Sequence, residues 1–395
     1  MARPLARHEP MPVSAARWLL HWGFFSCAPV VFGFLRRVRP ALELPPIADR
    51  IVLLRTCFIG DSVTFLPTIA SIRRAFPSAK LTVVASEAGA EIVSEESLVD
   101  EVMICSRRDF SRMSRLQKAR FMFQMWRLRP DLFIASTQEE DVWFSLLALF
   151  SGAKYRVGFS ESEGHFLFNV LVPARKDTSE INRNLDVLRE LCLPVMRDLP
   201  EVRVSLESAS RIESFLLGHG VSSNDLLVAI HPYGARPSRA WFVERYAQVA
   251  DAIVSLGMKV VLTGDSKDAP RIAEITLLMR GRPLMLSGML SISELKALLR
   301  RCALVVTVDT GTMHLAVALG TPTVALFGPG DFLKWGYHVP HFTAIRKPVS
   351  CAPCYRFECD DEHGHKCMDL IAVEDVLDTV KAVLRRRMNA WTEVV

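Results

Sequence analysis

The sequence predicts an α/β protein built from two Rossmann-like, doubly wound domains that face a central cleft. Three observations predict this fold. The chain has 395 residues, which is more than one ordinary domain needs. Short apolar runs alternate with helical patterns, as βαβ units of a parallel sheet require. This alternation stops after about residue 160 and restarts at residue 226. Two such sheets would bring the ligand loops at their strand ends to one shared cleft.

Composition narrows the classes of function. Half of the residues are hydrophobic and 23% are charged, so wholesale disorder is excluded. The net charge of +5 is mild. It suits an anionic partner such as a nucleotide or a membrane surface, and we expect no nucleic-acid partner, because dense Lys/Arg clustering is not evident. Nine Cys do not suit a secreted disulfide framework, so a reducing cytoplasm is expected.

The N-terminal 49 residues differ from the rest. The run "WLLHWGFFSCAPVVFGFL" (Trp18 to Leu35) has no charged residue, just reaches spanning length, and lies between Arg17 and Arg36. It either spans the inner membrane, lies in the membrane interface, or packs on the protein as an extra helix. We expect a membrane-associating segment, so that the protein is peripheral or N-terminally anchored at the cytoplasmic side. "ELPPIADR" (Glu43 to Arg50) is a proline-stiffened linker.

The first domain is expected over residues 50–205. The strand-like runs of this half are 50–56, 80–86, 100–105, 131–136 and 154–159. Helical patterns occupy 62–76, 111–129, 142–150 and 181–191, and the second of these is basic and amphipathic. Residues 160–205 are otherwise mixed and lead into a hinge.

The second domain is expected over residues 206–370, followed by a C-terminal helix within 371–395. Strands are predicted at 226–231, 259–264, 284–288, 303–308 and 321–328. Helices are predicted at 242–256, 268–280, 291–302, 310–320 and 373–388. No G-x-G-x-x-G occurs in the first βα turn, which disfavours a dinucleotide-dependent dehydrogenase.

The stretch "VVTVDTGTMHLAVALGTPTVALFGP" (305–329) is the strongest candidate for a ligand site. Its strand ends at Asp309, and a helix then runs to Gly320. Thr310 or Thr312 can cap this helix, and Gly311 lets the backbone approach a ligand. The free N–H groups and positive dipole of a helix N-terminus suit a diphosphate. A plain capped core helix is the alternative. "FGP" (327–329) adds a second loop at the same sheet edge, which favours the anion site.

This stretch closely resembles the signature of glycosyltransferase family 9, the ADP-heptose:lipopolysaccharide heptosyltransferases. Three further segments agree in the right order. They are "IVLLRTCFIGDSVTFLPTIASIRRAFPSAKLTVV" (51–84), "HPYGARPSRAWFVERYAQVADAI" (231–253) and "SCAPCYRFECDDEHGHKCMDLI" (350–371). The resemblance covers residues 51 to about 385.

The resemblance implies a GT-B fold, an N-terminal acceptor domain, a C-terminal donor domain, and inverting transfer without a catalytic metal or cofactor. Asp61 matches the family's proposed general base, and Arg239 stands where a Lys usually contacts the donor diphosphate. Asp265 matches an acidic residue near the donor nucleoside or sugar. The donor-binding loop matches Asp309, Thr310, Gly311, Thr312, Met313 and His314. "YGARPS" departs from the family's Thr-rich run, and Asp61 as a plain helix cap remains the alternative.

The implied activity is transfer of a heptose, or a related sugar, from a nucleotide-sugar donor, with ADP-heptose expected, to a lipopolysaccharide core or other lipid-linked acceptor. A carboxylate from one domain can take the acceptor proton, and a cation with helix N–H groups from the other can stabilise the departing diphosphate. A nucleotide-sugar epimerase and a non-catalytic sugar-nucleotide-binding protein are the alternatives on the same fold.

A Cys cluster precedes the final helix. Cys351, Cys354, Cys359 and Cys367 have the spacing C-x2-C-x4-C-x7-C, with His363 and His365 inside it. C-x2-C is a common start of a zinc site, but the other intervals are not those of a standard finger. Structural zinc, reduced thiols and facultative disulfides all remain open.

Overall fold

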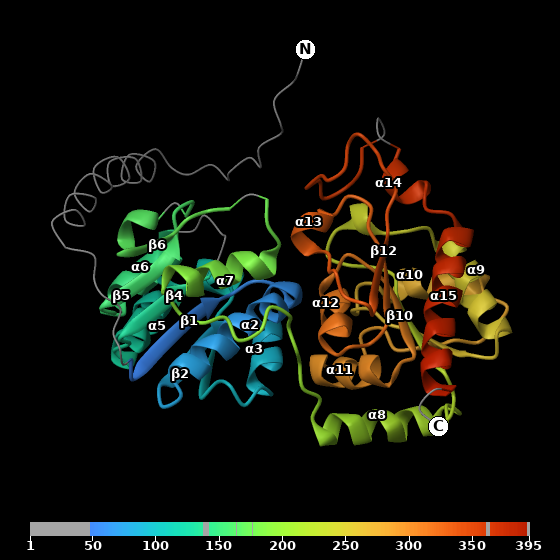
Figure 1. The fold of residues 1–395 in the computed structure, drawn as a ribbon, viewed down its shortest axis with the longest axis horizontal. Helices are drawn as coiled ribbons and strands as arrows, with labels where there is room; N and C mark the ends of the chain where they lie inside the picture. Colours follow the sequence, from blue (N-terminus) through green and yellow to red (C-terminus); the bar gives the residue numbers. More distant parts are fainter. Residues whose placement is uncertain (1–47, 137–141, 163, 176, 361–363, 393–395) are drawn as a thin grey trace, which may run out of the picture.

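The computed structural model describes residues 48–136, 142–162, 164–175, 177–360 and 364–392. It contains two parallel six-stranded sheets, one in each half of the chain (Figure 1). The predicted membrane-associating segment Trp18–Leu35 and His363 lie outside the described residues. Within the described part of the chain, no helix combines the length and the apolar character needed to cross a bilayer.

The first sheet has the strand order β3-β2-β1-β4-β5-β6. Its strands are β1 (Arg50–Arg55), β2 (Lys80–Ala85), β3 (Glu101–Ile104), β4 (Leu132–Ala135), β5 (Tyr155–Phe159) and β6 (Val170–Val172). Its helices are α2 (Ile59–Ala75), α3 (Glu87–Ser94), α4 (Arg107–Arg112), α5 (Arg115–Leu128), α6 (Val142–Phe150), η1 (His165–Leu167) and α7 (Glu180–Glu190). The reversal of strand order beside β1 is the topological switch point at which α/β proteins bind ligands.

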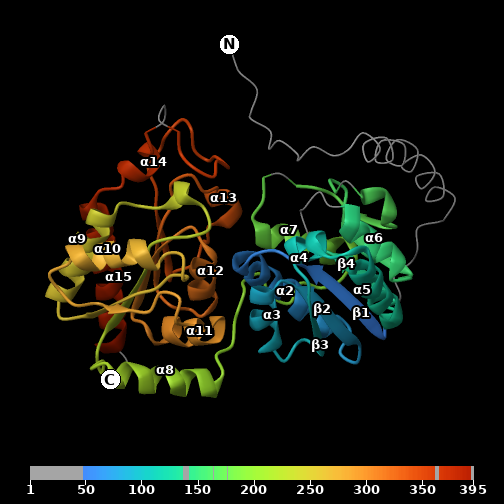
Figure 2. The same ribbon diagram turned by 180° about the vertical axis from the view of Figure 1, so that it is seen from behind.

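The helices cover both faces of this sheet because its strands are apolar on both sides. Alternate β1 residues such as Leu53 join the core under α2, α3 and α7, and Leu54 joins the core under α4, α5 and α6. Figures 1 and 2 show α2, α3 and α7 on the side of the second domain and α5 on the outer flank.

The second sheet has the strand order β12-β11-β10-β7-β8-β9. Its strands are β7 (Leu227–His231), β8 (Lys259–Leu262), β9 (Leu284–Met285), β10 (Leu304–Val308), β11 (Thr323–Leu326) and β12 (Phe342–Ile345). Its helices are α8 (Leu206–Gly218), η2 (Pro237–Arg239), α9 (Val243–Ser255), α10 (Ala269–Leu278), α11 (Ile292–Arg301), α12 (Gly311–Ala318), α13 (Phe332–Trp335), α14 (Lys366–Asp369) and α15 (Val373–Thr392). Helices α9, α10 and α15 pack on one face, and α8, α11 and α12 pack on the other.

The predicted fold class is confirmed, but some elements differ. The helix predicted over 111–129 is two helices, because Ser106 and Ser114 each cap a separate helix start. Strands β6 and β12 and helix α8 were not predicted. Both strands are short edge strands of three and four residues, which carry little periodic signal.

The two domains meet along helices. The core under α2 continues into the core under α12, so the interface is apolar as well as polar. At one end of it, the ammonium of Lys296 lies 2.6 Å from a carboxylate oxygen of Glu95, and the Lys296 side chain is fully buried. The backbone N–H of Ile292 donates to Glu91 over 3.1 Å. These contacts join α3 of the first domain to α11 of the second.

Candidate functional site

Asp61 lies in the first turn of α2, directly after the carboxyl end of β1. Its Oδ1 accepts a 2.8 Å hydrogen bond from the guanidinium of Arg55, the last residue of β1. Its Oδ2 accepts from the backbone N–H of Phe58 over 3.3 Å. Asp61 therefore does stabilise its helix start, as the alternative interpretation held, but it is also part of an ionic network.

The network is centred on a buried cation. The Arg55 guanidinium is 2% exposed, lies 2.9 Å from a carboxylate oxygen of Glu180, and also donates to the carbonyl of Ser136. From the second domain, the Lys334 ammonium lies 3.9 Å from Glu180. A buried Arg with two carboxylates is tolerable only because each charge has a partner.

Burial and the charge of Arg55 shift the pKa of Asp61 in opposite directions. Burial raises the pKa of the Asp61 carboxyl, while the Arg55 charge works to lower it; burial prevails and the pKa lies above its ordinary value of 3.8. A carboxylate with a raised pKa binds a proton more strongly, which is a property of general bases.

Arg239 and Asp309 lie together at the carboxyl edge of the second sheet. Arg239, at the end of η2, donates to the backbone carbonyl of Asp309 over 2.7 Å, and its guanidinium lies 3.2 Å from Asp309 Oδ2. The second contact lacks hydrogen-bond geometry, so Oδ2 is buried without a hydrogen-bond partner among the described residues. Burial raises the pKa of Asp309, and the Arg239 charge opposes this. Two of the predicted donor residues are thus brought together.

The turn after Asp309 leads into α12 as predicted, but its caps differ. Thr310 occupies the N-cap position with extended backbone, and its side chain makes no capping hydrogen bond. The hydroxyl of Thr312 instead lies 3.1 Å from Nε2 of His231, whose Nδ1 lies 3.0 Å from the hydroxyl of Thr263. Met313 is fully buried in the core. The expected side-chain caps were therefore wrong, because these groups bond across the strand ends or pack inward.

Asp265 lies at the same sheet edge, beyond the end of β8. Its side chain is exposed and accepts hydrogen bonds from the backbone of Lys267 and Asp268 over 2.7 and 3.2 Å. Its charge acts on His231, but burial dominates there and lowers the pKa of His231 to about 4. Asp265 thus borders the Arg239–Asp309 region and stays open to solvent.

The two halves of the candidate site meet at two glycines. A Cβ on Gly60 would lie 2.6 Å from the ring of His314, and a Cβ on Gly311 would lie 2.7 Å from Cβ of Ile59. The first turns of α2 and α12 therefore touch, which places Asp61 of one domain beside the 309–314 turn of the other. Gly311 was expected to admit a ligand, but the neighbour that approaches it here is α2.

His314 is a buried neutral residue at this contact. Its Nδ1 lies 2.6 Å from the hydroxyl of Tyr337, and its ring packs edge-on against Trp335. Burial, together with the Arg239 charge, lowers the pKa of His314 to about 3. The imidazole is therefore uncharged at neutral pH and shapes the contact between the domains.

Sequence reasoning missed three members of the site. Arg55 had a signal, since it is a charged residue at the end of an otherwise apolar strand. Glu180 and Lys334 had none, because Glu180 contacts Arg55 across 125 residues of chain and Lys334 contacts Glu180 across 154. Only the folded arrangement brings them together.

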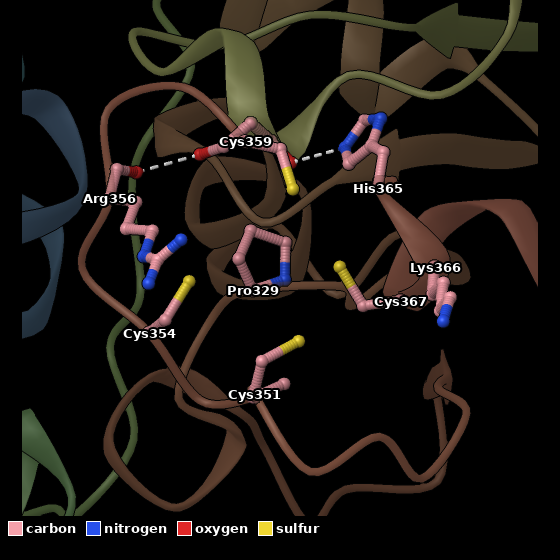
Figure 3. A pocket seen from close by; sticks show the side chains of 10 residues that line it. Pro329, Cys351, Cys354, Arg356, Cys359, His365, Lys366 and Cys367 are labelled. Carbon is pink, nitrogen blue, oxygen red and sulfur yellow. Dashed lines mark hydrogen bonds between the residues drawn. The ribbon is translucent and has the colours of Figure 1, made fainter. Parts of the chain in front are cut away.

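The Cys-rich segment (residues 350–371) packs against the loops that carry this site. The hydroxyl of Ser238 donates to the carbonyl of Arg356 over 2.8 Å, and Nε2 of His365 donates to the carbonyl of Ser238 over 2.7 Å (Figure 3). On the other loop, the N–H of Cys354 donates to the carbonyl of Pro329 over 2.9 Å. The segment therefore holds both the Arg239 loop and the 327–329 loop.

The four thiols of this segment line one pocket beside Pro329 (Figure 3). None of them forms a disulfide. Burial, together with the other three thiols, raises the pKa of Cys367 to about 11. Across the described ranges, no group of three or more His, Cys, Asp or Glu side chains is arranged to hold a metal ion. In this structure the four thiols are free side chains of a packed segment.

A family model and a curated relative resemble this chain. Residues 136–365 match the model of glycosyltransferase family 9 (heptosyltransferase). The chain is 25% identical over 336 residues to lipopolysaccharide heptosyltransferase 3 of Escherichia coli K12, covering 82% of this chain and 95% of that protein.

Two solved structures share the fold. E. coli ADP-heptose lps heptosyltransferase II superimposes with a TM-score of 0.72 at 21% identity, over 86% of this chain and 99% of that one. E. coli heptosyltransferase WaaC with ADP-2-deoxy-2-fluoro heptose gives 0.63 at 17% identity, over 84% and 99%. With the family match spanning more than half of the sequence and the two-sheet GT-B fold in place, the chain belongs to glycosyltransferase family 9 and is a glycosyltransferase of the heptosyltransferase type.

Proposed function

We propose that this enzyme moves a heptose from ADP-heptose to a lipopolysaccharide core or other lipid-linked glycan at the cytoplasmic face of the inner membrane, with inversion at the anomeric carbon. The observation that carries the proposal is the contact between α2 and α12, which sets the Asp61 carboxylate of one domain beside the Arg239–Asp309 loop of the other. The names of the curated relatives support the acceptor class, and the ADP-sugar bound to WaaC supports the donor.

The reaction is a single displacement. Asp61 takes the proton of the acceptor hydroxyl as its oxygen forms a bond to the anomeric carbon. The bond from that carbon to the diphosphate oxygen breaks, and ADP leaves with the electron pair. Arg239 and the N–H groups at the start of α12 stabilise the charge that develops on the leaving group.

In this proposal, three of the six residues at 309–314 face the donor and the other three support the turn. The backbone of Asp309, Thr310 and Gly311 faces the donor diphosphate, with Arg239 beside it. The buried side chains of Thr312, Met313 and His314 hold that turn in place rather than touch the donor. Asp265, exposed at the neighbouring strand end, is assigned to the nucleoside or sugar.

The test is a transfer assay with purified full-length protein. ADP-heptose is incubated with lipopolysaccharide lacking its outer heptoses, and ADP release and acceptor mass are measured. One added heptosyl group per acceptor, with the inverted anomeric configuration by NMR, is the expected product. Transfer from UDP- or GDP-sugars instead would overturn the assignment of ADP-heptose as the donor. Interconversion of the sugar nucleotide without acceptor would indicate an epimerase, and binding without turnover would indicate a sugar-nucleotide-binding protein.

Arg239→Ala should weaken ADP binding by about ten- to a hundredfold. A charge-assisted hydrogen bond contributes ~1.5–3 kcal/mol, and this variant removes the cation that faces the phosphates. Arg239→Lys should lose less, because it keeps the charge but not the two-pronged geometry. Titration calorimetry with ADP measures both. Arg282→Gln, on an exposed loop of the same domain, is the control. Equal affinity in Arg239→Ala and in the unchanged protein would remove Arg239 from the donor site.

A further inference from the structure

Helix α5 carries large apolar side chains on its outer face as well as on its inner face. Its inner face inserts Phe121 and Met125 into the core under the first sheet. Its outer face presents three large apolar side chains to solvent. Leu116 is 62% exposed, Phe123 is 56% exposed and Trp126 is 47% exposed. The rings of Phe123 and Trp126 stack on each other with centroids 5.6 Å apart.

Cations flank this exposed stripe. Residues 107–129 contain eight Lys and Arg and a single Asp, a local excess larger than the +5 of the whole chain. Arg120 and Arg127 share the outer face with Leu116 and Phe123, since residues three, four and seven positions apart lie on one side of a helix. The predicted basic character of 111–129 thus lies beside the exposed apolar side chains of α5.

An exposed apolar stripe with flanking cations fits one partner better than others. Aromatic and aliphatic side chains enter the boundary between lipid headgroups and acyl chains, while Lys and Arg pair with anionic headgroups. A second copy of the chain fits poorly, because a twofold contact through α5 would oppose like charges. RNA would use the cations but leave Leu116 and Phe123 in water.

We propose that the outer face of α5 docks the acceptor domain on an anionic phospholipid surface. The face lies on the flank of the first sheet away from the donor domain (Figures 1 and 2). Docking there leaves the donor domain free of the membrane while the domain proposed to hold the lipid-linked acceptor stays against it. The inference deepens the proposed function, on whose membrane location it rests, and does not depend on the identity of the sugar.

The test is vesicle binding by the full-length protein. Vesicles of phosphatidylcholine alone are compared with vesicles in which about a third of the lipid is phosphatidylglycerol. Each cation near such a surface contributes about fivefold to partitioning, so Arg120→Gln/Arg127→Gln should bind the anionic vesicles about 25-fold more weakly. Added salt should weaken binding of the unchanged protein in the same direction. The matched control is Leu277→Ser/Arg282→Gln, which alters an exposed Leu and an exposed Arg of the donor domain.

A second readout reports on lipid contact at α5 itself. Brominated lipids quench Trp fluorescence on contact, and Trp126→Phe keeps the aromatic character of the stripe. Quenching should fall in this variant relative to the unchanged protein, whatever other Trp residues contribute. Equal quenching in both proteins, or equal vesicle binding by the double Arg variant, overturns the proposal.

Other partners give distinct results. Loss of polyuridylate binding without loss of vesicle binding in the double Arg variant would point to RNA. A concentration-dependent dimer in sedimentation that Phe123→Ser abolishes would point to a second copy. Either outcome would overturn the proposal that α5 docks on a phospholipid surface. Since neither vesicle binding nor quenching requires turnover, a failure here is distinguishable from a failure of heptosyl transfer.

Discussion

Asp61→Asn should lower the turnover number by ~10²–10⁴, the range expected when a general base is removed. The amide keeps the shape of the side chain but cannot take the acceptor proton. ADP affinity should stay within a few-fold of the unchanged protein, because the proposed donor contacts come from the other domain. Steady-state kinetics with ADP-heptose, together with calorimetry of ADP, separates the two effects. Full activity in Asp61→Asn would leave Asp61 as a helix-stabilising residue only.

The pH dependence gives a second check on the same residue. Burial, opposed by Arg55, raises the pKa of Asp61 above 3.8. Only the ionised carboxylate can act as a base, so kcat/KM should rise with pH as Asp61 loses its proton. The acidic limb of the profile should lie above the ordinary range of an Asp. That limb should vanish in Asp61→Asn, whereas a limb that persists belongs to another group.

Gly311→Val should lower kcat/KM by about a hundredfold or more, although no side chain is removed. A Cβ at this position would lie 2.7 Å from Cβ and 2.9 Å from Cγ2 of Ile59, so the first turns of α2 and α12 must separate. A shift of about 1 Å between catalytic groups can cost a hundredfold in rate. ADP affinity should fall by less than about tenfold, since the new side chain points at α2.

Two further variants serve as controls for Gly311→Val. Gly218→Val adds the same side chain at the end of α8, where no atom lies within 4 Å of the new Cβ, and should leave activity unchanged. Ile59→Gly should restore much of the activity lost in Gly311→Ala, because it removes the atoms with which the new methyl collides. If Gly311→Val instead weakened ADP binding as much as transfer, the added side chain would obstruct the donor rather than displace α2.

The sequence predicted the two sheets well because buried parallel strands are continuous apolar runs that end at recognisable turns. It also placed Asp61, Asp265 and Asp309 at strand ends, since each directly follows such a run or its turn. Edge strands β6 and β12 were not predicted, because three or four residues are too few to show the alternation of apolar and polar residues in a strand. The break between α4 and α5 was not predicted, because both helices are rich in Lys and Arg and look like one continuous helix in the sequence.

The chemistry around those strand ends was harder to predict. Thr312 is a good capping residue, but in the fold its hydroxyl meets His231, which lies 81 residues earlier. The network of Arg55 and Glu180 joins positions 125 residues apart. Burial determines the charge of His314, and burial follows from packing across the domain interface. Such features depend on tertiary contacts that no local pattern contains.

The pair of glycines at the domain contact limits how this enzyme can exchange parts with its relatives. Gly60 belongs to the first domain and faces His314 of the second, and Gly311 of the second domain faces Ile59 of the first. A hybrid that joins one half to the other half of a relative inherits only one member of each pair. Such hybrids should assemble a working site only when the residues facing both glycines fit, so the two halves are not freely interchangeable modules.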